Sequence, residues 1–165
     1  MKMRLMTSLI IAILLIATLT LPAAADVLGN KTATVTVNSD ISVTIIDGGA
    51  VNIVFGALDA GTTNNLDTTA SDTIPSITLS VSGTSVVDLQ VSGTDFGTGF
   101  AVSNAKFNNT YSTTGTIAMS TSPVQIADEV NPGTDVDLWF WLDVPASGVI
   151  AGSYSSTFTF EAVED

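Results

Sequence analysis

The stretch VDLWFWLDV, residues 136–144, alternates apolar side chains in the way that a β-strand at the centre of a core does. After the turn-like segment 145–152 the alternation resumes over 153–162. Two neighbouring strands with matched aromatic faces predict a hairpin, and that face is the expected centre of a β core. The residues expected to face the core are Leu138, Phe140, Leu142 and Val144 in the first strand and Tyr154, Phe158, Phe160 and Ala162 in the second.

The opposite face of 136–144 carries Trp139 and Trp141. A pair of exposed indoles is typical of a subunit contact or of a platform for sugar rings. Alternatively, a loop such as 104–115 covers them within the same domain. The pattern does not choose between these arrangements, so we treat Trp139 and Trp141 as a candidate contact patch.

The N-terminal 25 residues have the organisation of a secretory signal peptide. Lys2 and Arg4 precede an apolar run over 5–21, and Pro-Ala-Ala-Ala follows at 22–25. The run is shorter than the roughly 20 residues that cross a bilayer, which argues against a retained membrane anchor. We therefore expect cleavage after Ala25, a mature form with no stable membrane span, and an extracellular, cell-surface location.

The composition excludes several classes of function. With residues 1–25 removed, Lys31 and Lys106 stand against 16 acidic residues, a formal charge of −14, which repels nucleic acid. The chain has no His and no Cys, and so lacks the usual general base, thiol nucleophile and commonest metal ligand. We expect no enzyme activity, no cofactor and no nucleic-acid partner.

Calcium is the ion that the available oxygen ligands would suit best. The candidate carboxylates lie in two loops but lack the spacing of a dedicated calcium loop, so we interpret them as solvated acids and predict no metal site. They are Asp59, Asp67, Asp72 and Asp95.

An unbroken period-2 pattern runs over 32–46, which is longer than most single strands. A bend at 38–40 would divide it. Either two strands belong to different sheets, or the first half reaches beyond its own domain. Ala33, Val35 and Val37 form the apolar face of that first half, and we treat 26–38 as a candidate donor strand.

The rest of the chain shows short alternating runs separated by turn signals, and no long run with helical periodicity. This pattern predicts an all-β fold, a single Ig-like antiparallel β-sandwich over 39–165. The expected strands before the final pair lie at 41–46, 51–55, 76–82, 86–92, 100–103, 117–119 and 124–126.

Two Asn-x-Thr sequons begin at Asn30 and Asn108. Such sequons arise by chance in a chain rich in Asn, Ser and Thr. Asn30 and Asn108 are therefore candidate glycosylation sites only.

Four short stretches together resemble a known family: FGAL at 55–58, GTDF at 93–96, WFWLDVP at 139–145 and AGSY at 151–154. They are similar to stretches of TasA/camelysin-like exported fibre proteins, in particular archaeal bundling pilins. The resemblance implies a jelly-roll-like sandwich that assembles into extracellular fibres, with the N-terminal segment of one subunit supplying a strand to the next. The metalloprotease activity associated with camelysins is not expected, because the chain has no zinc-ligand motif.

Two hypotheses follow. In the first, the protein is a secreted structural subunit of a fibre or pilus, a homopolymer that grows head-to-tail by donation of the strand with Ala33, Val35 and Val37. In the second, it is a monomeric cell-surface binding module, with Trp139 and Trp141 as a carbohydrate platform and the N-terminal strand paired within its own sheet.

Overall fold

The computed structural model describes residues 39–47 and 52–165. This part of the chain is all-β, as predicted, with a single 3-10 turn, η1, as its one helical element. The strands and the turn, in chain order, are β1 (Ile41–Asp47), β2 (Asn65–Leu66), β3 (Ile77–Gly83), β4 (Val87–Gly93), η1 (Val102–Asn104), β5 (Ala105–Asn108), β6 (Ile117–Ala118), β7 (Val124–Val130), β8 (Asp135–Leu142) and β9 (Phe158–Glu164).

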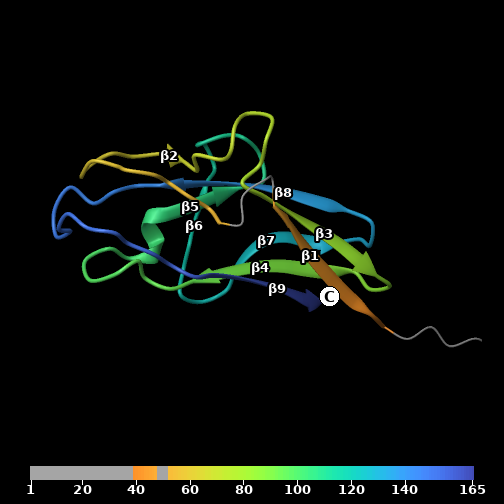
Figure 1. The fold of residues 1–165 in the computed structure, drawn as a ribbon. Coiled ribbons are helices and arrows are strands. Elements are labelled where there is room, and N and C mark those ends of the chain that lie inside the picture. Colours follow the sequence, from red (N-terminus) through yellow and green to blue (C-terminus); the bar gives the residue numbers. More distant parts are fainter. Residues whose placement is uncertain (1–38, 48–51) are drawn as a thin grey trace, which may run out of the picture. The chain divides into compact units, whose positions relative to one another are not determined.

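The strands form two antiparallel sheets (Figure 1). The first has the order β1-β3-β8-β5-β6, and β2 pairs with the end of β8 that β3 leaves free. The second has the order β7-β4-β9. Buried side chains from both sheets belong to one hydrophobic core, an arrangement consistent with a β-sandwich.

The core follows the predicted alternation. In β3 and β4 every second side chain is buried and the intervening ones are polar, so each strand presents one apolar face to the other sheet. Strand β8 differs, because its residues 138–142 are buried on both faces. Burying a side chain the size of Leu or Phe contributes about 1.5–3 kcal/mol, so β8 is a major source of the stability of the fold.

The predicted hairpin at the end of the chain is wrong. Strand β8 lies in the first sheet, whereas β9 lies in the second and pairs with β4. The two aromatic faces do meet, but across the core: the ring centroids of Phe140 and Phe158 are 5.5 Å apart. Alternation reports which face is buried and does not report the partner strand, so a face-to-face pair was mistaken for a side-by-side pair.

Three local predictions are also corrected. Residues 52–55 make no strand, because no described strand lies beside them to complete a ladder. The segment 102–104 is a 3-10 turn, and Ala105–Asn108, predicted as part of a loop, is the strand β5. The strands predicted at 41–46, 76–82, 86–92 and 124–126 are confirmed as β1, β3, β4 and β7, and the one at 117–119 as the short β6.

The predicted signal peptide 1–25, the donor residues Ala33, Val35 and Val37, and the sequon at Asn30 lie outside the described residues. Over 39–47 and 52–165, no helix has the length and apolar character needed to cross a membrane.

Candidate functional site

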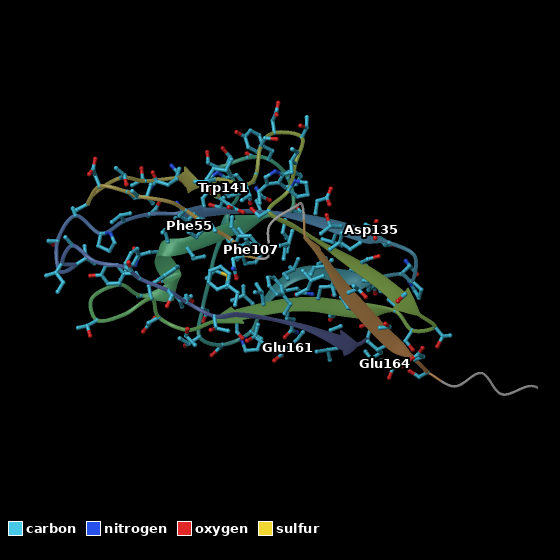
Figure 2. The ribbon with its side chains drawn as sticks, in the orientation of Figure 1. Phe55, Phe107, Asp135, Trp141, Glu161 and Glu164 are labelled. Atoms are coloured by element: carbon cyan, nitrogen blue, oxygen red, sulfur yellow. The ribbon has the colours of Figure 1, made fainter. Side chains whose placement is uncertain are left out.

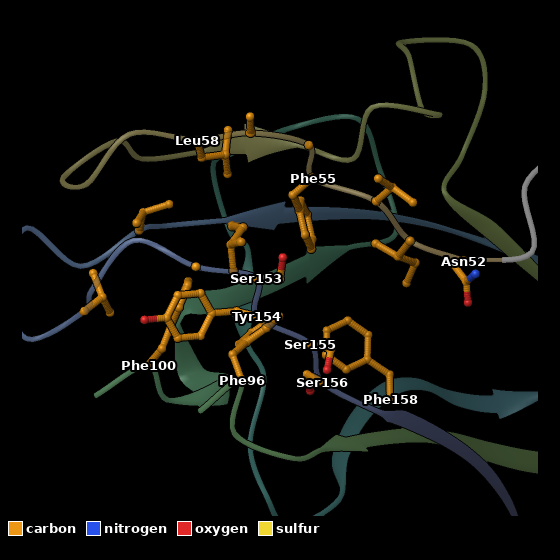
Figure 3. Close-up of a pocket in the computed structure, with 18 of the residues that line it drawn as sticks. Asn52, Phe55, Leu58, Phe96, Phe100, Ser153, Tyr154, Ser155, Ser156 and Phe158 are labelled. Carbon is orange, nitrogen blue, oxygen red and sulfur yellow. The ribbon is translucent and has the colours of Figure 1, made fainter. Parts of the chain in front are cut away.

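An apolar groove of about 1170 Å³ opens between two extended segments of the chain (Figure 3). One wall, which we call wall A, is the segment 52–58. The other, wall B, is the segment 149–158, which leads into β9. Residues from the first sheet, from the segment after β8 and from the loop after β4 line the space between the walls: Ile77, Leu142, Val144, Phe96 and Phe100.

Wall A is fixed through Val54. The backbone N–H of Val54 donates to Oδ1 of Asp67 at 3.0 Å, and its carbonyl accepts the backbone N–H of Thr68 at 2.7 Å. Asp67 is only 1% exposed, and its carboxylate also accepts the N–H and the hydroxyl of Thr69. The buried carboxylate therefore acts as the anchor of wall A, because a buried anion requires such a set of donors.

Wall B is held by hydrogen bonds within its own first residues and by a close contact between the loop after β4 and the turn that precedes the wall. The hydroxyl of Tyr154 donates to the carbonyl of Ile150 at 2.7 Å and accepts the Ile150 N–H at 3.1 Å. Gly99 has a φ of +78°, and a Cβ there would lie 2.2 Å from the carbonyl oxygen of Gly148. Only glycine permits this close approach, which sets the turn of wall B against the end of the groove.

The two walls share a feature that is unusual for extended backbone. The backbones of Ile53 and Phe55 form no hydrogen bond with another described residue, and neither do those of residues 151–156. At wall A the backbone groups of Val54 point to Asp67 and Thr68, so those of its two neighbours point the other way. Extended segments with unused donors and acceptors are templates for another strand.

The side chains around the groove favour an uncharged, apolar occupant. Figure 3 shows Phe55 and Leu58 on one side, with Phe96, Tyr154 and Phe158 on the other. Asp59 is the one charged residue among the lining residues. A charged ligand would lose its hydration here without gaining a partner, whereas apolar side chains would gain from burial.

The groove continues between the free edges of the two sheets. A second, smaller cavity of about 110 Å³ lies between β1 and β9, and Ile45 and Phe160 line both cavities. Ile41 and Ile45 of β1 remain 38% and 46% exposed although they lie on the face toward the core. The two sheets are therefore incompletely closed along this side of the described structure.

The described chain begins at the end of β9 that is remote from walls A and B. The hydroxyls of Ser39 and Ser85 both donate to the carboxylate of Glu164, and these hydrogen bonds lower the pKa of Glu164, with the bond from Ser39 as the larger cause. Figure 2 shows Phe55 of wall A near one end of the described strands and Glu164 near the other. The first described residue, Ser39, therefore lies far from the walls.

Trp139 and Trp141 are buried, with 8% and 3% of their surface exposed. The ring of Tyr111, from the loop that could cover them, lies 6.4 Å from each indole between ring centroids. The Nε1 of Trp139 donates to the carbonyl of Ser71 at 2.7 Å. The prediction that Trp139 and Trp141 form an exposed contact patch or sugar platform is therefore wrong. The two indoles form a small core on the outer face of the first sheet.

Two of the four candidate carboxylates, and the sequon residue Asn108, have structural partners. Asp67 anchors wall A, and Oδ1 of Asp95 accepts the N–H of Val102 at 2.8 Å. No group of three or more acidic residues within 39–47 and 52–165 is placed to hold a metal ion. The Nδ2 of Asn108 donates to the carbonyls of Ser112 and Thr114, so a glycan on that nitrogen would disrupt both bonds.

The groove itself was not predicted from the sequence, although a signal was present. The stretches FGAL and AGSY, quoted above for the family resemblance, lie on walls A and B, and Phe96 of GTDF lies between them. Their Gly and aromatic content indicates tight turns and an apolar surface, but only the fold brings them together.

No protein-family model matches the chain, and a search of curated proteins finds no relative with significant similarity.

Proposed function

We propose that the protein is an exported structural subunit of an extracellular fibre or pilus, and that the segment with Ala33, Val35 and Val37 of one copy fills the groove of the next. In this proposal residues 1–25 are a cleaved signal peptide, and the domain is a jelly-roll or Ig-like sandwich completed by the donated strand. The observation that carries the proposal is an apolar groove whose two walls both have unused backbone hydrogen-bonding groups.

The chemistry of the segment matches that of the groove. Residues 32–38, Thr-Ala-Thr-Val-Thr-Val-Asn, carry no charge and alternate small apolar with polar side chains. Burial of Val35 and Val37 would contribute about 1.5–3 kcal/mol each. Each backbone hydrogen bond to a wall would add about 0.5–1.5 kcal/mol net.

The length of the chain favours donation to another copy. Val35 precedes Ser39 by four residues and can lie at most about 14 Å from it. Ser39 contacts Glu164, and about 20 Å of strand separates Glu164 from Phe158 at the near end of wall B. A neighbour aligned head-to-tail presents its walls to the segment directly, and such a contact propagates because its two surfaces differ.

Deletion of residues 26–38 tests the proposal. The full chain is expected to form filaments visible by negative-stain microscopy, and the deleted chain is expected to stay a folded monomer. A synthetic peptide of residues 26–38 should bind the deleted chain, whereas the same peptide with Val35→Asp and Val37→Asp should not, because charge is costly to bury. Filaments of the deleted chain, or equal binding of both peptides, would overturn the proposal.

A further inference from the structure

Lys106 lies against two side chains from residues that flank other strands of the first sheet. Its Nζ is 2.7 Å from Oδ2 of Asp143 and 2.9 Å from Oδ1 of Asn64. Oδ1 of Asp143 accepts the backbone N–H of Asn64 at 2.7 Å. An amine, an amide carbonyl and a carboxylate thus meet at one point, where Asn64 directly precedes β2, Asp143 directly follows β8, and Lys106 lies in β5.

We propose that Lys106 and Asn64 form an intramolecular isopeptide bond with the assistance of Asp143. The carboxylate of Asp143 accepts a proton from the Lys106 ammonium, and the free amine attacks Cγ of Asn64. The Nζ–Cγ bond forms and the Cγ–Nδ2 bond breaks. Asp143 gives this proton to the leaving nitrogen, which departs as ammonia, and its carboxylate then takes the second proton from Nζ as the amide forms, so that no oxidant or other co-reactant is needed.

The arrangement of Asn64 supports this chemistry. Its φ is +54°, a left-handed conformation that is uncommon outside glycine, and the bond from its N–H to Asp143 holds it there. The neighbouring amide of Asn65 is used differently, since its Nδ2 donates to the carbonyl of Leu142 and the hydroxyl of Thr62. Asn64 is therefore the amide presented to the lysine.

The contact between the reacting groups raises the rate of bond formation. Lys106 is opposite Trp141 in the ladder, and its side chain and that of Asp143 are only 20% and 29% exposed. Reacting groups held in contact behave as if their concentration were about 10⁵–10⁸ M. A bond that has to form only once in the lifetime of each molecule does not require a fast step.

The bond would strengthen the part of the fold that carries the groove. It would join positions separated by 42 residues and cross over β8, in a chain that has no cysteine and therefore no disulfide. Asn64 follows wall A by a few residues, so the cross-link would connect the segment after wall A to β5. This consequence gives the bond a role in a fibre subunit under tension, although the bond itself does not depend on the proposed function.

Mass spectrometry of the purified, denatured full chain tests the proposal. Once the N-terminal residue has been identified, the wild-type chain is expected to be lighter than its calculated mass by one ammonia. Digestion beside aromatic residues should release one branched peptide containing both Asn64 and Lys106. A succinimide also loses ammonia, but it leaves these residues on separate linear peptides, so the branched peptide is the decisive product.

The variants Lys106→Arg and Asp143→Asn should each have their full calculated mass, because the first lacks the nucleophile and the second lacks the base. Asn109→Ser, at an exposed asparagine, should retain the loss of ammonia. A wild-type chain of full mass with two separate linear peptides would overturn the proposal and leave Lys106 and Asp143 as an ordinary ion pair.

Discussion

The ring of Phe140 stacks on that of Phe158, with 5.5 Å between centroids and 27° between ring planes. Phe140 lies in β8 of the first sheet and Phe158 begins β9 of the second, so this contact joins the two layers. Phe158 also lines the groove, and it contacts Phe96 edge-on at 6.3 Å. The same aromatic cluster therefore links the centre of the core to wall B.

Phe140→Ala should lower the free energy of unfolding by about 3–5 kcal/mol, because the fully buried ring leaves a cavity that its neighbours fill only partly. Urea denaturation followed by tryptophan fluorescence measures the change. Thr159→Ala, at an exposed position of β9, is the control and should change stability by no more than about 0.5 kcal/mol. Equal effects of the two substitutions would contradict the assignment of Phe140 to the core.

Asp67→Ala should destabilise the domain by about 1–3 kcal/mol, since it leaves the part-buried N–H groups of Val54 and Thr69 without an acceptor. Hydrogen exchange at the amides of Val54 and Thr69 should become faster. Asp67→Asn retains one carbonyl oxygen at the same place and should have a smaller effect on both amides. Unchanged exchange at Val54 in Asp67→Ala would show that the carboxylate does not anchor wall A.

Much of this fold could be predicted from alternation, because alternation records which face of a strand is buried. The apolar faces of β3, β4 and β8 were predicted in this way. The pairing of strands could not be predicted, because β4 and β9 are far apart in the sequence and neither contains a pattern that identifies the other as its neighbour. Wall A has the composition of a strand but no described partner, and a missing partner cannot be recognised from the residues of the wall alone.

Trp141→Ala should lower the free energy of unfolding by about 3–5 kcal/mol, because Trp141 is a buried residue beneath Tyr111. Under the binding-module hypothesis, the same change would reduce retention on immobilised glycans and leave stability intact. We expect no such retention by the wild-type chain. Retention that is lost on Trp141→Ala without loss of stability would restore the carbohydrate hypothesis.

The carboxylate of Glu164 should titrate with a pKa below the ordinary range of glutamate, because the Ser39 and Ser85 hydroxyls stabilise its charged form. A lowered pKa in the folded state means that this contribution to stability is present above the unfolded-state pKa and is lost as the pH falls through the folded-state pKa. NMR titration of the Glu164 side chain measures the pKa. Ser39→Ala should raise the pKa toward its ordinary value, and Ser122→Ala, in a distant loop, should not change it.

Only part of the candidate site could be predicted from the sequence. The uncharged alternation of 32–38 predicts a strand whose partner the sequence does not identify, and this prediction led to the fibre hypothesis. The groove required the fold, because walls A and B are about a hundred residues apart in the chain. The contact of Lys106 with Asn64 and Asp143 had no local signal, since three isolated polar residues become a cluster only through the order of β2, β8 and β5.

Disulfide formation between separately labelled copies shows directly whether one copy donates its N-terminal segment to the groove of the next, because the natural chain has no cysteine. One copy carries Val35→Cys, and the other carries a single cysteine at Ile53, Ala57 or Ser155 on the groove walls. The two chains are mixed unfolded, refolded together and oxidised. We predict a cross-linked dimer of the two different copies for at least one wall position, and none for Thr113→Cys, at an exposed residue outside the groove. Cross-links that form only when both cysteines are in the same chain, or at no wall position, would contradict the account.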